Sequence, residues 1–330
     1  KTLLLKKRAG LIKNHDDSEG VRLVYIDPPF STGLVFKSND NKKAYRDKLD
    51  GSEFIEFLRK RLILMRELLS EEGSIFVHLD WKKAHYVKLV MDELFGEENF
   101  LNDIIWHYGG RGAKAVAKQF SRNHDIILWY RKDRHVFNRP LVKRRIKKGE
   151  GGFREDEDGR WFKTSPKGDY TDESVAALTK AGRIHTTRNN KVRVKYFLKE
   201  DGEYLIEEIP MSDVWDDIPD AMHLPKAEKT GYPTQKPEAL LERLISAASN
   251  EGDIVLDGFA GSGTTLAVAE RLKRRWIGID SSALSVRTIE KRLLSLGKHG
   301  VNPPQSPPYT RGGLGGLTPF ALYTAALPKP

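Results

Sequence analysis

Segments with the apolar spacing of strands alternate with segments that have the apolar spacing of helices, in the first part of the chain and again between about 237 and 296. Leu23–Ile26 is a continuous apolar run that ends at Asp27, and Pro28-Pro29 cannot continue a β-ladder, so a buried strand is expected to end there. Gly73 is expected to cap a helix that begins near Glu53, before a strand at 74–79. The helix is predicted from the spacing of Phe54, Phe57, Leu58, Leu62, Met65 and Leu69.

The same alternation continues along the first part of the chain and returns near its end. It predicts a mainly parallel sheet flanked by helices, an α/β and Rossmann-like architecture. Further helices are expected at about 82–95, 237–249, 265–273 and 283–296, and further strands at 104–106, 126–130, 254–257 and 276–280.

The character of the sequence changes at about Asp133. A basic run, the break Gly151-Gly152 and short strand-like pieces such as 192–198 indicate an inserted module at 133–230. The main domain would then be discontinuous, formed by 1–132 and 231–300. Residues 301–330 are rich in Pro and Gly without a period, which is typical of a flexible tail.

The composition adds a preference for a polyanionic partner. The net charge of the 330 residues is +10 with a pI near 9.4, and 31% of the residues are charged, which favours DNA or RNA. No apolar run is long enough for a membrane span, so a membrane is not expected as a partner. The absence of cysteine excludes thiol nucleophiles and zinc–thiolate sites and is compatible with a cytoplasmic location.

A glycine-rich loop follows the strand that ends at Asp257. Gly261 and Gly263 would let a ligand approach the backbone at a helix N-terminus. Thr264 stands where a phosphate-binding P-loop needs lysine, and Leu266 where a dinucleotide loop needs a third glycine. A nucleoside-like ligand remains, and Asp280 at the end of the next strand could accept both hydroxyls of a ribose. S-adenosylmethionine fits; a tight turn without a ligand is the alternative.

Asp27-Pro28-Pro29-Phe30 has the residue types that methyl transfer to a base amino group requires. The lone pair of an exocyclic amino nitrogen is delocalised into the ring. Acceptors at both amino hydrogens, the Asp27 carboxylate and the Pro28 carbonyl, favour the pyramidal nitrogen of the transition state. Phe30 could stack on a flipped base. Alone, the motif could equally be a proline-rich turn.

In this order the two motifs resemble the β-class DNA amino-methyltransferases, especially the modification subunits of type III restriction systems and their stand-alone relatives. The resemblance covers roughly residues 20–296 and implies a target-recognition domain between the motifs. It assigns the cofactor to Asp257, Phe259, Ala260, Gly261, Gly263, Thr264 and Asp280, with Thr234, Gln235 and Lys236 at its methionine end. A second copy of the chain and a restriction subunit remain open as partners.

The expected activity is therefore site-specific methylation of adenine N6 in DNA. Methylation of cytosine N4 is the alternative, because the same motif can serve it, and Asp rather than Ser at position 27 favours adenine. An inactive DNA-binding relative is less favoured. The basic run of the inserted module predicts phosphate contacts, although a solvated surface would have the same composition; its members are Lys143, Arg144, Arg145, Lys147 and Lys148. No spaced cluster of metal ligands is found, so His78, His107 and His124 are expected to be ordinary residues.

Overall fold

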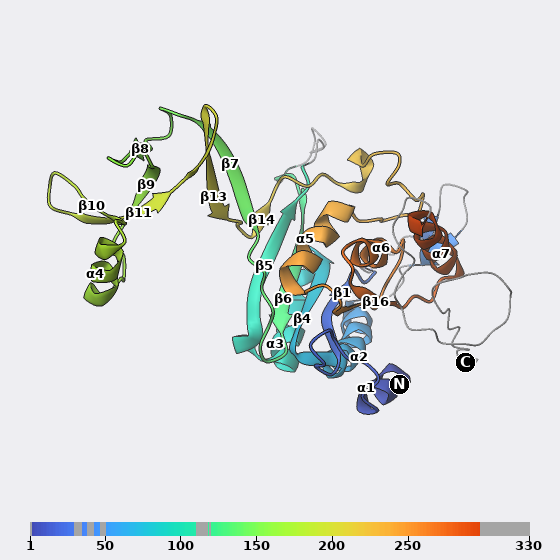
Figure 1. Cartoon of the computed structure of the whole chain (residues 1–330). Coiled ribbons are helices and arrows are strands. Elements are labelled where there is room, and N and C mark those ends of the chain that lie inside the picture. Colours follow the sequence, from blue (N-terminus) through green and yellow to red (C-terminus); the bar gives the residue numbers. More distant parts are fainter. Residues whose placement is uncertain are drawn as a thin grey trace. The chain divides into compact units, whose positions relative to one another are not determined.

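The computed structural model describes residues 2–29, 35–37, 43–46, 51–109, 118 and 120–297. Figure 1 shows the elements in chain order. Phe30 of the Asp-Pro-Pro-Phe motif and the predicted tail at 301–330 lie outside the described residues. The described backbone includes a short antiparallel pair, β2 (Val35–Lys37) and β3 (Lys43–Arg46).

The chain divides into two compact units. The smaller one is Arg139–Met211, and the larger one takes the residues before and after it. This range is narrower than the inserted module expected at 133–230. The difference arises because Val214–Trp215 forms β14, which pairs in parallel with β5 and so belongs to the large sheet.

A seven-stranded sheet forms the centre of the larger unit, in the order β14-β5-β6-β4-β1-β15-β16. All neighbours pair in parallel except β6, which is antiparallel to both β4 and β5. The mainly parallel α/β sheet expected from the sequence is therefore present. The remaining strands are β1 (Val21–Ile26), β4 (Leu69–Asp80), β5 (Phe100–His107), β6 (His124–Arg131), β15 (Ile254–Asp257) and β16 (Arg275–Gly278).

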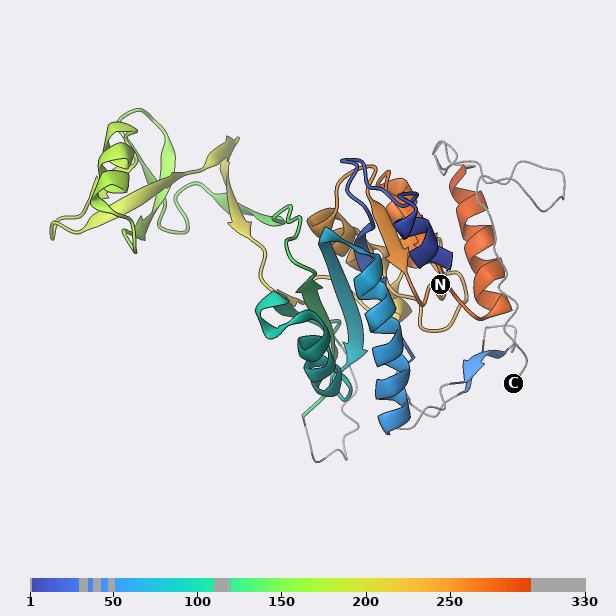
Figure 2. The ribbon, with the colours of Figure 1, turned by 90° about the horizontal axis from the view of Figure 1, so that it is seen from below.

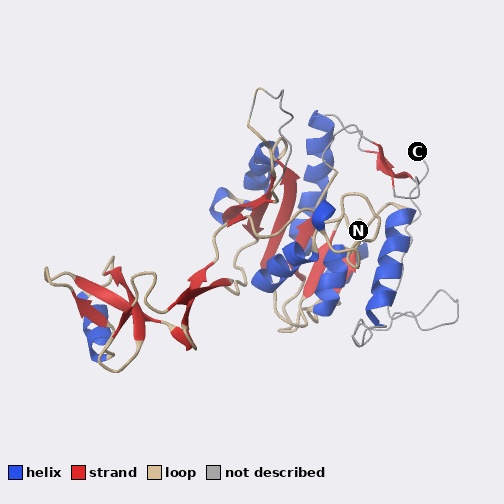
Figure 3. Ribbon diagram, turned by 90° about the horizontal axis from the view of Figure 1, so that it is seen from above, coloured by secondary structure: helices blue, strands red, loops and turns tan. Residues whose placement is uncertain are grey.

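Helices cover both faces of this sheet (Figure 3). Side chains of α2 and α3 form a core with every second residue of the central strands, such as Val24 and Val77. Figure 2 shows α2 running along the sheet. Helices α5 and α6 pack together and against β1 and β15. The helices are α1 (Thr2–Arg8), α2 (Gly51–Leu68), α3 (Ala84–Phe95), α5 (Glu238–Ala248), α6 (Thr264–Arg271) and α7 (Ala283–Gly297), with short 3-10 turns at Glu97–Asn99 and Ala221–His223.

The expectation that Gly73 caps α2 was wrong. The helix ends at Leu68, and Gly73 lies inside β4, at a shift of register against β1. A Cβ at this position would come within 2.9 Å of the Ser70 carbonyl oxygen. Glycine is therefore needed for a close backbone approach within the strand.

The smaller unit consists of two antiparallel sheets and one helix. One sheet has the order β10-β11-β9-β8 and the other β12-β13-β7. Thr171 caps α4 by accepting a hydrogen bond from the Ser174 backbone N–H. The elements are β7 (Leu141–Lys147), β8 (Arg154–Glu155), β9 (Trp161–Pro166), α4 (Asp172–Lys180), β10 (Ile184–Thr186), β11 (Val192–Phe197), β12 (Lys199–Asp201) and β13 (Tyr204–Pro210).

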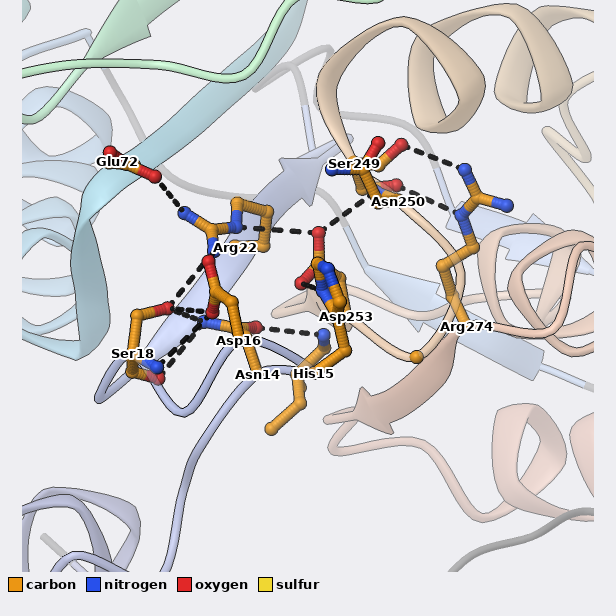
Figure 4. Close-up of polar contacts among 12 residues, drawn as sticks. Asn14, His15, Asp16, Ser18, Arg22, Glu72, Ser249, Asn250, Asp253 and Arg274 are labelled. Carbon is orange, nitrogen blue, oxygen red and sulfur yellow. Dashed lines mark hydrogen bonds and ion pairs between the residues drawn. The ribbon is translucent and has the colours of Figure 1, made fainter.

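A charged cluster lies at the amino ends of β1 and β15 (Figure 4). Its centre is Arg22, whose side chain is completely buried. The guanidinium donates to Asp16 and to Glu72 (3.2 Å), and its Nε lies 3.3 Å from the buried carboxylate of Asp253. His15 Nδ1 lies 2.8 Å from the other Asp253 oxygen. The oxygens and nitrogen of His15, Asp16 and Asp253 are close enough to share a cation, but Arg22 already supplies the positive charge there.

Among the described residues, no helix is both long enough and apolar enough to cross a membrane.

Candidate active site at the carboxyl edge of the sheet

Three of the predicted site carboxylates lie at or just after the carboxyl ends of neighbouring parallel strands. Asp27 follows β1, Asp257 is the last residue of β15, and Asp280 follows β16. The pairing of Tyr25 with Asp257 aligns the first two strand ends, and that of Asp257 with Gly278 aligns the next two. Because ligands bind at this edge of open α/β sheets, the structure brings the separate sequence motifs to one place.

The glycine loop forms a tight connection between β15 and α6. Gly261 (φ 49°) and Gly263 (φ 74°) both have left-handed backbone conformations, which favour glycine. A Cβ on Gly263 would also lie 2.7 Å from Ile289 of α7, whereas at Gly261 the nearest atom, on Tyr232, is 3.5 Å away. Gly263 is therefore required by packing as well as by the turn, while at Gly261 a Cβ would make only ordinary contact with Tyr232.

Asp280 holds the glycine loop through its side chain. One carboxylate oxygen accepts a hydrogen bond from the Gly261 backbone N–H (2.8 Å), and the other accepts one from the Ser282 N–H (2.7 Å). The carboxylate thus fixes the loop and the start of the next segment. Each oxygen keeps a second lone pair, so this role is compatible with the predicted contact to a ribose.

Asp257 is a buried carboxyl group within the same loop, with 2% of its surface exposed. It accepts hydrogen bonds from the Phe259 backbone N–H (2.9 Å) and the Thr265 hydroxyl (2.5 Å). Burial, together with the negative charges of Asp27 and Asp280, raises the pKa of Asp257 to about 7 despite these bonds. One of its oxygens thus holds the loop backbone and the other a side chain of α6. Ala260 is held by a hydrogen bond from its N–H to the Ile279 carbonyl.

Asp27 forms an ion pair with Lys236, with 2.5 Å between Nζ and Oδ2. Both side chains are mostly buried, at 18% and 12% exposure. The second oxygen of Asp27, Oδ1, is buried and has no hydrogen-bond partner in the described part of the chain. A buried carboxylate oxygen without a donor is costly, and such an atom at a strand end is typical of a site that awaits a ligand.

The segment Thr234-Gln235-Lys236 lies against the start of α6. Thr264 Oγ1 donates to the Lys236 carbonyl at 3.3 Å. Thr234 has a left-handed backbone (φ 60°), which is uncommon for a β-branched residue and marks strain at this loop. The Gln235 side chain accepts from Thr230 and donates to the Glu228 carbonyl, so it holds its own loop together.

Sequence reasoning missed a buried polar chain beside Asp27. The Tyr25 hydroxyl lies 2.9 Å from His78 Nδ1, and His78 Nε2 lies 3.1 Å from an Asp125 oxygen. His78 is fully buried, and Asp125 lies at the carboxyl edge, beside the end of β4. Burial works to raise the pKa of Asp125, but the hydrogen bond and charge of His78, with Lys236, hold it below its usual value. The expectation that His78 is an ordinary residue did not include these contacts, because no local pattern links three strands.

The basic run of the smaller unit lies on β7 and at Lys148 directly after it, opposite acidic residues of its sheet. Three of its five cations form ion pairs: Lys143 with Glu208 (3.9 Å), Arg145 with Asp201 (3.1 Å) and Lys148 with Glu200 (2.5 Å). Arg144 and Lys147 have no ion pair among the described residues and are exposed. Most of the run is therefore electrostatically compensated.

The chain belongs to the DNA methylase family of N6 and N4 amino-methyltransferases, whose model matches residues 21–291. It is 35% identical to the type II methyltransferase M.EcaI of Enterobacter cloacae over 84% of this chain and 65% of that protein. It is 27% identical to a probable type III HindVI Mod subunit of Haemophilus influenzae, over 82% and 47% of the two chains. The DNA adenine methyltransferase YhdJ of Escherichia coli is 29% identical, over 84% and 77%. The chain thus spans about two thirds of M.EcaI and about half of the Mod subunit.

Proposed function

We propose that this protein transfers a methyl group from S-adenosylmethionine to the exocyclic N6 of an adenine flipped out of DNA. The observation that carries the proposal is the position of Asp27. Its free oxygen Oδ1 lies at the carboxyl edge of the sheet, at the end of the strand next to the one that carries the glycine loop. Family membership supports DNA as the substrate.

The cofactor fits the residues at this edge. Gly261 has no side chain to block a close approach, and Asp280 keeps lone pairs for the hydroxyls of a ribose. The lysine that a nucleoside triphosphate would need after Gly263 is replaced by Thr264. When bound, S-adenosylmethionine supplies a methyl group on a positively charged sulfur. The residues that would hold it are Asp257, Phe259, Ala260, Gly261, Gly263, Thr264 and Asp280, with Thr234, Gln235 and Lys236 at its methionine end.

Asp27 prepares the acceptor nitrogen. One amino hydrogen would donate to Oδ1 and the other to the Pro28 carbonyl, so the nitrogen lone pair is drawn out of the ring plane. The new N–C bond would form as the methyl–sulfur bond of the donor breaks, and the amino group would then lose one of its two protons. The ion pair with Lys236 holds the carboxylate in place through its other oxygen. Because these hydrogen bonds strengthen as positive charge develops on nitrogen, they favour the transition state over the bound substrate.

Adenine is preferred over cytosine for two reasons. The acceptor at position 27 is Asp rather than Ser, and a relative of this chain is named as a DNA adenine methyltransferase. Cytosine N4 is the second candidate, because the same two acceptors can hold its amino group. The smaller unit would read the target sequence, and a second copy of the chain or a restriction subunit would be further partners, as the name of the Mod-subunit relative suggests.

The proposal is tested by incubating duplex DNA with methyl-labelled S-adenosylmethionine and identifying labelled nucleosides by mass spectrometry. Label in N6-methyladenine is the expected result. Label in N4-methylcytosine would replace the substrate base but keep the chemistry. Labelled DNA from the Asp27→Ala protein at the parent rate would overturn the mechanism.

A further inference from the structure

Two arginines on one face of the four-stranded sheet in the smaller unit have no acidic partner among the described residues. In this sheet Arg154 lies opposite Phe162, Phe162 opposite Phe197, and His185 opposite Arg193. Residues directly opposite one another share a face, and so do alternate residues of one strand, which adds Lys195. This face, called here the β9–β11 basic face, is defined by Arg154, His185, Arg193 and Lys195.

The two arginines of this face are held in place by neutral groups. Arg154 Nη1 lies 2.9 Å from His185 Nε2. Arg193 donates from Nε to the Thr164 hydroxyl (2.8 Å) and from Nη2 to the Thr164 carbonyl (2.9 Å). Neither arginine forms an ion pair with any described acidic residue. Both charges are therefore fixed in position but not compensated.

Lys195 lies over the ring of Phe162 and forms an ion pair with Asp156 at 3.8 Å. Its charge is therefore compensated, as are those of the paired cations of β7. Burial, and then the positive charges of Arg154, Lys195 and Arg193, lower the pKa of His185, so the neutral form of this ring is favoured. The uncompensated charge of the face is that of Arg154 and Arg193.

The opposite face of the same sheet is occupied by the protein itself. Tyr196, which alternates with Lys195, hydrogen-bonds Tyr170 just before α4. Lys163, opposite Tyr196, is paired with Glu207 at 2.5 Å. The lysine of this opposite face is therefore paired, whereas Arg154 and Arg193 on the first face have no ion pair among the described residues.

We infer that the β9–β11 basic face, rather than the basic run on β7, binds the phosphate backbone of duplex DNA. The inference rests on the proposed function, which makes the smaller unit a DNA-reading module. Phosphate oxygens suit this face because planar guanidinium groups donate in pairs to them, and both arginines keep unused N–H groups. On β7 three cations would first have to break existing ion pairs.

The experiment compares two variants that lose the same charge. Arg154→Gln/Arg193→Gln removes two uncompensated cations, and Arg145→Gln/Lys148→Gln removes two paired ones from β7. Affinity for a fluorescent duplex is measured from low to moderate salt without cofactor. We expect the slope of log affinity against log salt to fall by about 1.8 in the first variant, about 0.9 for each phosphate contact, and by less than about 0.5 in the second.

An unchanged slope in Arg154→Gln/Arg193→Gln, or the larger loss in the β7 variant, would overturn the inference. Circular dichroism and S-adenosylmethionine binding check that each variant is folded. If the double variant does not fold, the single change Arg154→Gln at an exposed residue replaces it, with an expected loss of about 0.9 in the slope of log affinity against log salt. Methyl transfer by the parent is measured separately. If the parent methylates DNA and the first variant keeps the parent's salt slope, only the inference about the β9–β11 basic face is refuted. If the parent binds duplex DNA but transfers no methyl group, only the proposed function is refuted.

Discussion

Carboxylates lie at both edges of the central sheet, but the partners of these carboxylates differ between the two edges. At the amino edge, one buried arginine contacts Asp16, Glu72 and Asp253. At the carboxyl edge, Asp27 pairs with one lysine and keeps a buried oxygen without a donor among the described residues. Burial, with the added negative charges of Asp27 and Asp280, raises the pKa of the neighbouring Asp257. The amino edge compensates its buried charges by ion pairs, although Arg22 Nε, 3.3 Å from Asp253, makes no hydrogen bond within the described part of the chain. The carboxyl edge instead leaves one oxygen of a negatively charged group without a donor, which is unfavourable electrostatically. Function is therefore expected where such a buried charged group lies at the edge that binds ligands.

The largest effect is expected from Asp27→Asn. The change keeps the shape of the side chain but replaces one acceptor by a donor, so turnover at saturating cofactor and DNA should fall on the order of 10³-fold. The variant should also lose stability, by up to about 3–5 kcal/mol, because the change removes the charge that pairs with the mostly buried Lys236. Methyl transfer and denaturant unfolding are measured on the same protein. A variant that keeps more than a tenth of the parent rate would show that the acceptor lies elsewhere.

Arg22→Met should produce the largest loss of stability. It leaves the fully buried Asp253 without its arginine, and breaking a buried ion pair costs about 3–5 kcal/mol. Arg134→Met is the matched control, since Arg134 is exposed and contacts the same Glu72 at 3.5 Å. The unfolding free energy of Arg134→Met should be lower than that of the parent by less than about 1 kcal/mol. Equal unfolding midpoints in urea for the two variants would mean that the cluster is not a stabilising centre.

The two edges should also respond to pH in opposite directions. The pKa of Asp257 is raised to about 7, so its ionisation weakens the fold as pH rises from about 4 to 7, by roughly 3 kcal/mol. Burial works to raise the pKa of Asp16, but hydrogen bonds from Ser18 and the charge of Arg22 lower it to about 2. Asp16 therefore contributes stability that is lost as pH falls from about 4 to 2.

Denaturant unfolding of the parent, Asp257→Asn and Asp16→Asn between pH 2 and 8 separates these contributions. In Asp257→Asn the unfolding free energy should decline less steeply above pH 4 than in the parent. In Asp16→Asn it should rise less steeply between pH 2 and 4. A parent curve that keeps its slope in both variants would assign the pH dependence to other groups.

The smallest effect concerns the buried polar chain. Tyr25→Phe removes only the hydroxyl that faces His78, which should cost about 0.5–1.5 kcal/mol. His78→Leu leaves both the Tyr25 hydroxyl and the Asp125 carboxylate without this partner and should cost about 1–3 kcal/mol. Unfolding free energies that rank the two variants the other way would contradict the chain as described.

Local periodicity in the sequence was enough to predict most of the large unit. The apolar runs that became β1 and β15 end at Pro or Gly, and the helix around Leu58 and Leu62 follows from a spacing that buries one side. The short strand Val214–Trp215 could not be predicted, because two residues carry no period. The same applies to Gly73, whose place in β4 depends on a register shift against a strand far away in the sequence.

The site was predicted as a set of motifs but not as a set of contacts. The strand ends at Asp27 and Asp257 follow from the chain, since parallel strands present them at one edge. The Lys236–Asp27 pair joins residues that are 209 positions apart, and the Tyr25–His78–Asp125 chain crosses three strands. The ion pairs of β7 arise from its pairing with β13 and the neighbouring β12. Such contacts depend on tertiary pairing, which a local pattern does not encode.

The most direct test of the division between the edges is the single-turnover rate of methyl transfer to DNA by Asp27→Asn and Arg22→Met, at saturating S-adenosylmethionine and at a temperature where both remain folded. The account predicts a rate near that of the parent for Arg22→Met and one lower on the order of 10³-fold for Asp27→Asn. A folded Arg22→Met protein that is as slow as Asp27→Asn, or an Asp27→Asn protein that is as fast as the parent, would contradict it.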